Sequence, residues 1–207
     1  MAKPKEGVSD RILNCAKEEF MEKGYMNASL RVIAAKAGTT TGSIYTRFGD
    51  KEGLFSAIVE PVADGMMERF LKIQESFHEF DPQVQREQMG SYTSDEMEGL
   101  LNYMYDYFDE FSLLLDAAYG TKFQSFLDKL VDIEVEYTYK YMEATGCKSV
   151  ASGAVTEEVI HLVVTAYFNG VFEVIRHRMS REEAGKYIHI LQKYHLAGFD
   201  TILSPES

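Results

Sequence analysis

At residues 38–52 the chain reads "GTTTGSIYTRFGDKE". The stretch combines glycines and hydroxyl side chains at high density with only two basic residues, Arg47 and Lys51. Small polar residues of this kind can cradle a phosphate in a loop, or they can line a short helix that contacts DNA. Both tasks bring the chain against a polyanion, although its formal net charge is −12. The flanking elements must therefore decide between them.

Three short helices are predicted before residue 50, because polar caps alternate with apolar residues at helical spacing. Ser9, Ser29 and Thr40 can cap their N-termini, and Gly24 and Gly38 can end the first two. The residues that would face a shared core are Ile12, Leu13, Ala16, Phe20, Leu30, Ile33, Ala34, Ala37, Ile44 and Phe48. The second and third helices, joined by "AGTT", have the proportions of a helix-turn-helix.

A helix-turn-helix places its second helix in the major groove of DNA, while its first helix crosses the backbone. Hydroxyl groups on the outer face of the second helix can contact base edges, and helix N-termini favour a phosphate. The residues that would face outward there are Thr41, Gly42, Ser43, Tyr45 and Thr46. Helix N-termini at Ser29 and Thr40 and the cations Arg31, Arg47 and Lys51 complete the predicted DNA-binding set.

Residues 38–52 allow two other interpretations. A nucleotide-binding loop is disfavoured, because the chain has no G-x-x-x-x-G-K-[ST] segment and no strand precedes the stretch. A plain solvated loop between helices remains open on residue chemistry alone.

The segment from residue 9 to residue 54 resembles the N-terminal domain of TetR-family transcriptional regulators. That family shows an inward Ala and Phe, Gly-Tyr, a capped helix with Ile-Ala and Ala-Gly, Gly-x-[Leu/Ile]-Tyr-x-x-Phe, and Lys-Glu-x-Leu. The matching residues here are Ala16, Phe20, Gly24, Tyr25, Ser29, Ile33, Ala34, Ala37, Gly38, Gly42, Ile44, Tyr45, Phe48, Lys51, Glu52 and Leu54.

The resemblance implies a homodimeric regulator of double-stranded operator DNA, most often a repressor, that a small-molecule effector releases. By position it implies phosphate contacts at Ser29, Tyr45, Arg47 and Lys51, and groove contacts at Arg31, Thr41, Ser43 and Thr46. Three positions depart from the usual pattern: Thr39 replaces a valine, Arg47 a histidine and Thr41 a lysine. We expect Arg47 to preserve a phosphate contact, whereas the sequence leaves open whether Thr39 and Thr41 weaken the affinity for DNA.

Charge divides the chain in the same place as the resemblance. Residues 1–53 carry a net charge of +2 and residues 54–207 a net charge of −14. We therefore expect a DNA-binding domain over 1–53 and a helical effector-binding and dimerisation domain over 54–207.

The remaining sequence predicts further helices, which makes the fold class all-α with about nine helices. Asp50 can cap a long helix whose apolar residues recur four apart from Leu54 to Phe70, with a kink at Pro61. Residues 78–93 are expected to form a connection that includes a turn of helix after Asp81 and Pro82. A later helix is expected from the Thr93–Glu96 capping box to Gly120, with a break near 107–109. Another is expected over 121–144, before Gly146. The last two are expected from Thr156 to about His177 and from the Ser180–Glu183 capping box to about Leu203.

The last two predicted helices are apolar on more than one face, which suits a four-helix dimer interface. The candidate interface residues are Ile160, Val163, Val164, Tyr167, Val171, Val174, Leu191, Tyr194, His195, Gly198 and Ile202. The alternative is that these helices pack only within their own subunit.

Aromatic residues concentrate between 92 and 141, where they could line an effector pocket or fill the core. The candidate pocket residues are Tyr103, Tyr107, Phe111, Asp116, Phe123, Phe126, Glu134, Tyr137, Tyr141 and Phe168. The two acidic members, Asp116 and Glu134, raise the hypothesis of a cationic, partly apolar effector held by cation–π contact and a carboxylate.

Other function classes are disfavoured by what the sequence lacks. No apolar run approaches the length of a membrane span, the N-terminus is not a secretory signal, and two cysteines make no disulfide framework, so we expect a cytoplasmic protein. The histidines show no metal-ligand spacing, and no nucleophile, base and orienting group can be assembled. We therefore expect no metal, no cofactor and no enzyme activity. The alternatives kept open are a helical small-molecule carrier without a DNA-binding role and a transcriptional activator.

Overall fold

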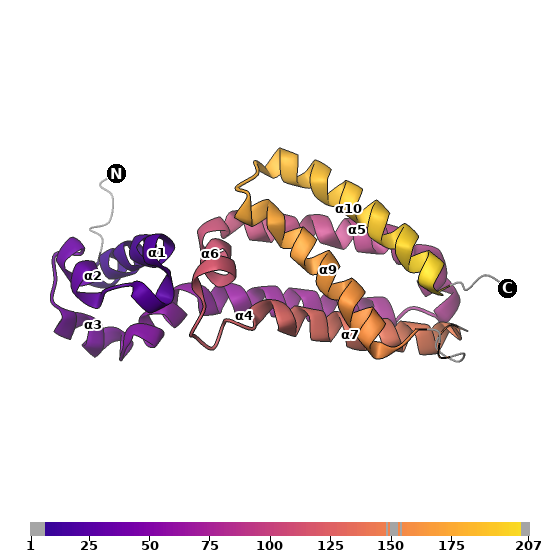
Figure 1. Cartoon of the computed structure of the whole chain (residues 1–207), viewed down its shortest axis with the longest axis horizontal. Helices are drawn as coiled ribbons and strands as arrows, with labels where there is room; N and C mark the ends of the chain where they lie inside the picture. Colours follow the sequence, from indigo (N-terminus) through magenta and orange to yellow (C-terminus); the bar gives the residue numbers. More distant parts are fainter. Residues whose placement is uncertain (1–6, 148, 150–152, 154, 204–207) are drawn as a thin grey trace. The chain divides into compact units, whose positions relative to one another are not determined.

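The computed structural model describes residues 7–147, 149, 153 and 155–203. Across these residues the regular structure is helical throughout, with nine α-helices and one π-helical turn (Figure 1). This confirms the predicted all-α fold class. Contacts group the chain into two compact units: Met1–Gly65 with Tyr107–Phe126, and Met66–Asp106 with Leu127–Ser207. The predicted functional boundary after residue 53 stays a prediction.

The first unit contains α1 (Val8–Asn27), α2 (Leu30–Lys36), α3 (Thr41–Phe48) and the first part of α4 (Lys51–His78). A later segment of the chain, with α6 (Phe108–Ser112) and the π-helical turn η1 (Leu113–Ala117), returns to this unit. Three of the predicted caps are confirmed, since backbone N–H groups donate to Ser29 Oγ at 3.5 Å, to Thr40 Oγ1 at 3.2 Å and to Asp50 Oδ1 at 2.7 Å.

The predicted cap at Ser9 is wrong. Helix α1 already begins at Val8, because the N–H of Gly7 donates to the Asp10 carboxylate at 3.0 Å and starts the helix two residues earlier. Gly24 interrupts α1 with a φ of +69°, a left-handed conformation that suits glycine.

Aromatic side chains build the core of the first unit. The Phe20 and Phe55 rings meet edge to face with centroids 5.0 Å apart, and Phe123 from the returning segment lies 6.2 Å from Phe55. Phe111, from the same segment, is fully buried. The returning segment therefore completes a core that α1 and α4 begin.

The second unit contains the rest of α4, α5 (Pro82–Asp106), α7 (Phe126–Thr145) from Leu127 on, α9 (Glu157–Arg176) and α10 (Arg181–Leu203). Helix α10 packs along both α5 and α9 (Figure 1). The Ser180–Glu183 capping box is confirmed, with N–H···O distances of 2.9 and 3.3 Å. The predicted break near 107–109 is also confirmed, because Tyr107 leaves helical geometry.

The prediction of a connection over residues 78–93 is wrong, and so is the capping box at Thr93 and Glu96. Helix α5 begins at Pro82, where a missing N–H costs nothing, and it continues through both residues. Thr93 lies in mid-helix and donates its hydroxyl to the Met89 carbonyl at 2.7 Å. In addition, α7 begins at Phe126 rather than at residue 121.

Helix α9 has an unusually apolar composition for this chain. Over the described residues it alone is long and apolar enough, by length and composition, to cross a membrane, although the sequence led us to expect no such run. A core helix passes the same test, and α9 buries the apolar side chains Ile160, Val164, Tyr167, Phe168, Val171, Phe172, Val174 and Ile175.

Candidate DNA interface and helical cavity

Helix α3 is held from one side and open on the other. Ile44 is fully buried and fixes α3 on the first unit, while the hydroxyl of Thr40 caps its first turn. Gly42 lies in the same turn, where an added Cβ would meet only Thr40 Oγ1 at 3.7 Å. The outer face of the first turn is therefore free of protein atoms and open to a close approach.

None of the ten predicted DNA-binding residues is buried. Exposed members are Arg31, Thr40, Gly42, Tyr45, Thr46 and Arg47, and half-buried members are Ser29, Thr41, Ser43 and Lys51. The Tyr45 side chain is 54% exposed, which is high for a large aromatic residue and leaves its ring and hydroxyl available. The first unit therefore brings the predicted set together around α2 and α3.

Polar groups along α3 are held by their own helix. Arg47 Nη1 donates to Ser43 Oγ at 2.6 Å and to the Ser43 carbonyl at 3.3 Å. Thr46 Oγ1 donates to the Gly42 carbonyl at 2.8 Å. These bonds orient the guanidinium and the hydroxyls before any ligand is bound, and an incoming phosphate would exchange with the Ser43 contacts of Arg47.

Lys51 is fixed at the start of α4. Its Nζ donates to the Met26 carbonyl at 3.0 Å and lies 4.8 Å from the centre of the Tyr25 ring. Burial lowers the pKa of this lysine. The side chain is thus a placed cation at the edge of the α2–α3 face, rather than a freely moving surface group.

Sequence reasoning missed the role of Gly53. An added Cβ at this position would lie 1.9 Å from the Phe48 carbonyl oxygen, so the junction between α3 and α4 closes only around a glycine. The signal was present in the segment Lys-Glu-Gly-Leu, in which the third position was treated as variable.

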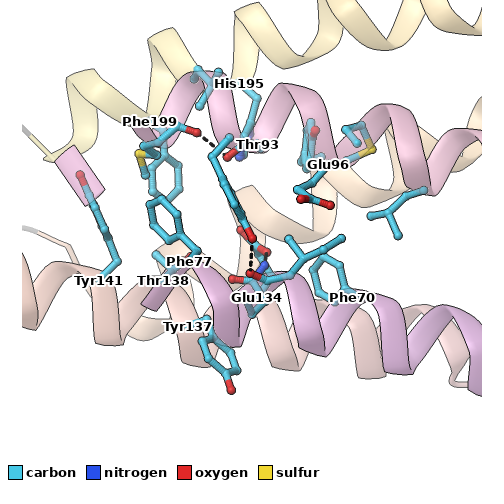
Figure 2. A pocket seen from close by; sticks show the side chains of 18 of the residues that line it. Phe70, Phe77, Thr93, Glu96, Glu134, Tyr137, Thr138, Tyr141, His195 and Phe199 are labelled. Carbon is cyan, nitrogen blue, oxygen red and sulfur yellow. Dashed lines mark hydrogen bonds between the residues drawn. The ribbon is translucent and has the colours of Figure 1, made fainter. Parts of the chain in front are cut away.

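A cavity of about 100 Å³ lies in the second unit (Figure 2). It is smaller than a typical drug-sized site, which occupies roughly 300–1,000 Å³. Five helices contribute its lining, which consists of Phe70, Ile73, Gln74, Phe77, His78, Met89, Tyr92, Thr93, Glu96, Met97, Leu100, Glu134, Tyr137, Thr138, Tyr141, Tyr167, Phe168, His195, Leu196 and Phe199.

Four of the predicted pocket residues line this cavity: Glu134, Tyr137, Tyr141 and Phe168. The ring of Tyr137 extends away from the other labelled side chains (Figure 2). The other six do not line it. One is Tyr103, over whose ring the Arg69 guanidinium lies, 4.0 Å from the ring centroid. The others belong to the first unit and are Tyr107, Phe111, Asp116, Phe123 and Phe126.

The cavity is acidic on one side. Glu134 Oε2 accepts a hydrogen bond from Gln74 Nε2 at 2.6 Å, and burial raises the pKa of Glu134 to about 7. Glu96 enters from α5, so that two carboxyl groups reach the hollow from different helices (Figure 2). The sequence had suggested Glu134 but not Glu96, Gln74 or His78.

Tyr167 and His195 also line the cavity, and their rings stack with centroids 4.1 Å apart. The Tyr167 side chain is only 8% exposed, and no group among the described residues meets the geometry of a hydrogen bond to its hydroxyl. The side-chain amide of Gln192 donates to the Thr93 carbonyl at 3.2 Å. Burial raises the pKa of Tyr167 and lowers the pKa of His195 to about 4. Both residues were candidates for the dimer interface, and the structure places them in this cavity.

Five of the eleven candidate dimer residues are not available on the surface of the protomer. Ile160, Val164, Tyr167, Val171 and Val174 are buried within the protomer, whereas Val163, Leu191, His195 and Ile202 are half-buried and Tyr194 and Gly198 are exposed. The large apolar side chains that α9 and α10 do expose are Val159, Leu162, Ile190 and Tyr194. The apolar stripe read from the sequence is therefore mainly the core-facing side of these helices.

The first quarter of the chain matches a known family model. Residues 12–58 match the model of bacterial regulatory proteins of the tetR family. The chain is 35% identical over 75 residues to the HTH-type transcriptional regulator UidR of Escherichia coli, which covers 36% of this chain and 38% of UidR. It is 40% identical over 57 residues to the HTH-type transcriptional repressor AcnR of Corynebacterium glutamicum, over 28% of this chain and 30% of AcnR. The match thus spans 38% of the length of UidR and 30% of the length of AcnR.

Solved structures extend the likeness to the whole fold. The structure of SmeT, the repressor of the Stenotrophomonas maltophilia multidrug efflux pump SmeDEF, aligns over 98% of this chain and 96% of SmeT with a TM-score of 0.61. The sequence identity is 19%, so this similarity concerns the fold alone. It includes the helical second unit, which lies outside the residues 12–58 that match the family model.

Proposed function

Because the chain belongs to the TetR family of bacterial regulatory proteins, a family of transcriptional regulators rather than enzymes, we propose that it binds operator DNA through α2 and α3 and represses transcription. The open face of α3 is the observation that carries this proposal. It presents Gly42, Tyr45 and Thr46 to solvent on a helix whose other side is anchored by Ile44.

The proposed contacts follow the chemistry of the face. Ser29, Tyr45, Arg47 and Lys51 would hold phosphates, because they combine a helix N-terminus, a phenol and two cations at the rim. Groove contacts would fall to Arg31, Thr41, Ser43 and Thr46, whose short side chains leave the backbone close to the bases. Thr40 and Gly42 would support that approach, since one caps the helix and the other clears its first turn.

A net charge of −12 is compatible with this role. The acidic residues lie mainly after residue 53, and the DNA-facing residues 1–53 carry +2. Few cations mean few displaced counterions, so we expect modest non-specific affinity and a salt dependence set by Arg31, Arg47 and Lys51.

The regulator would act as a homodimer in the cytoplasm. Two copies of α3 spaced about 34–36 Å apart would read successive major grooves of a palindromic operator. The exposed apolar side chains Val159, Leu162, Ile190 and Tyr194 favour α9 and α10 as the contact between copies. A mass measurement in solution checks this, and a monomer at micromolar concentration would contradict it.

A small apolar or amphipathic effector would occupy the cavity of the second unit. Binding can lower DNA affinity only by as much as the effector prefers the DNA-free conformation. Helix α4 contributes residues to both units, and so it is the element through which we expect this preference to be transmitted.

A gel-shift assay with the DNA upstream of the protein's own gene tests the proposal. We expect a retained complex for the wild-type chain and a loss of roughly tenfold or more in affinity for Tyr45→Ala and for Lys51→Ala, since each contact to a phosphate or base is worth on the order of 1–3 kcal/mol. Tyr119→Ala is the matched control, because Tyr119 is 77% exposed in the same unit and lies outside the predicted set. Unchanged retention in both interface variants would favour a helical carrier without a DNA-binding role, and transcription that falls when the gene is deleted would favour an activator.

A further inference from the structure

The carboxylate of Glu134 lacks a charged partner. Gln74 Nε2 is its hydrogen-bond donor, at 2.6 Å, and none of the ion pairs among the described residues includes Glu134. His78 is close in the lining, but its Nδ1 and Nε2 face the backbone carbonyls of Gln74 and Tyr137 at 2.8 and 3.0 Å. Glu134 is half-buried. Holding a carboxylate there with one neutral amide is costly, which leaves its charge available to a ligand.

The walls around Glu134 suit a cation with an apolar body. Aromatic rings from α4, α7, α9 and α10 border the hollow, and their negatively charged faces attract a cation. Glu96 adds a second carboxyl group, and the hydroxyl of Tyr167 adds a polar atom that a ligand can contact. In contrast, no Lys or Arg contributes to the lining, so an anionic ligand would meet no counter-charge there.

We propose that the cavity takes a small organic cation, a protonated amine on an aromatic or branched apolar body, whose N–H groups bind Glu134. This inference rests on the proposed function, because the organic cation would be the effector of the proposed regulator. A metal ion is the wrong occupant, because no group of three or more His, Cys, Asp or Glu side chains within the described residues could hold one. The small volume limits the body to about the size of one ring.

Ionisation of Glu134 makes the binding depend on pH. The burial that raises the pKa of Glu134 to about 7 leaves the carboxyl group mostly neutral at pH 6 and mostly ionised at pH 8. An alkylamine stays protonated over this range, because its pKa lies near 10. Amine affinity should therefore rise by nearly tenfold between pH 6 and pH 8.

Other titratable groups face the same hollow. They are Glu96 on α5, His78 on α4, His195 on α10, Tyr92 on α5, Tyr137 and Tyr141 on α7, and Tyr167 on α9. His195 stays neutral throughout, because burial lowers its pKa to about 4. The contribution of Glu134 is isolated by subtracting the pH profile of Glu134→Gln, in which the remaining groups are unchanged.

The experiment is calorimetric titration of the full-length protein with three matched probes. They are 2-phenylethylamine, which is cationic, 2-phenylethanol, which is neutral, and phenylacetate, which is anionic. Three variants accompany the wild type: Glu134→Gln, Glu96→Gln and the control Glu143→Gln, whose side chain is exposed on the same helix as Glu134. Glutamine at 134 keeps the shape and can still bond to Gln74, so the fold is preserved.

The expected result is preferential binding of the amine by at least tenfold over the alcohol, with that preference lost in Glu134→Gln, reduced in Glu96→Gln and kept in Glu143→Gln. Equal or tighter binding of the alcohol or phenylacetate overturns the proposal. So does an amine preference that survives Glu134→Gln, or failure of the amine to bind at millimolar concentration.

The proposed function is tested separately by gel shift without any probe. A protein that binds the amine but retains no operator DNA would contradict the regulator and leave the cation site standing. A protein that retains DNA but ignores the amine would contradict the cation site alone.

Discussion

The two units carry their functional surfaces in different ways. The candidate DNA interface is built from residues 29–51, a short stretch that forms α2, α3 and the first residue of α4. The cavity draws on five helices, from Phe70 to Phe199, so its walls come from residues more than a hundred positions apart. A surface encoded locally can be recognised from a short motif, whereas a cavity exists only after the helices have packed.

The largest effect on stability should come from the junction between α3 and α4, next to the candidate DNA interface. Gly53→Ala places a methyl group 1.9 Å from the Phe48 carbonyl oxygen, so the start of α4 must shift. We expect a loss of about 3 kcal/mol in the free energy of unfolding, measured by urea denaturation, together with loss of DNA retention. Gly99→Ala on α5 is the matched control, since its added Cβ meets nothing within 4 Å and should stabilise by about 0.5–1 kcal/mol. Equal behaviour of the two variants would show that the junction tolerates a side chain.

A smaller effect on stability is expected from the half-buried carboxyl group of Glu134 in the cavity of the second unit. The pKa of Glu134 is raised from 4.5 in the unfolded chain to about 7 in the fold, so the folded state binds the proton more tightly. This stabilisation is complete below pH 4.5 and is lost as the pH rises through 7. The loss is on the order of 2 kcal/mol after allowing for water that reaches the cavity.

Urea unfolding of the wild type and of Glu134→Gln at pH 5 and pH 8 measures this term. Relative to the wild type, the glutamine variant should be more stable at pH 8 than at pH 5, because it has no carboxylate to ionise. Every other titrating group is common to both proteins and cancels. Parallel stability curves would mean that Glu134 is solvated in the folded state.

The smallest effect on stability is expected from the Thr40 cap at the N-terminus of α3. Thr40→Ala removes the hydroxyl that accepts the Ser43 N–H at 3.2 Å, and it should lower stability by about 1 kcal/mol. DNA affinity should fall as well, because α3 loses order in its first turn. Thr40→Ser keeps the acceptor and should restore both properties; a serine variant that behaves like alanine would point to the methyl group instead.

Sequence reasoning succeeded where the chemistry is local. Ser29, Thr40 and Asp50 were recognisable as caps, and the inward period of Ile12, Ala16, Phe20, Ile33 and Ile44 matches the buried residues of the first unit. These features depend on neighbours three or four residues away. The same reasoning therefore predicted the exposed set around α3 from one short stretch, and the all-α class from helical spacing along the whole chain.

It failed where distant contacts decide. The sequence around Thr93 reads equally well as the start of a helix or its middle, and packing of α5 against α10 selects the middle. The stripe on α9 was read as a dimer surface, but periodicity shows only that one face is apolar and not what covers it. Likewise, the aromatic residues 92–141 look like one cluster until the break at Tyr107 divides them between two units.

The return of residues 107–126 to the first unit has a consequence for how such proteins can be recombined. Phe55 packs against both Phe20 and Phe123, although the codon for Phe123 lies about seventy codons after that for Phe55. A chimaera that exchanged only the N-terminal stretch would pair Phe55 with a foreign partner in place of Phe123. Grafting a new DNA specificity onto this chain therefore requires either changes confined to the outer face of α3 or the transfer of both segments together.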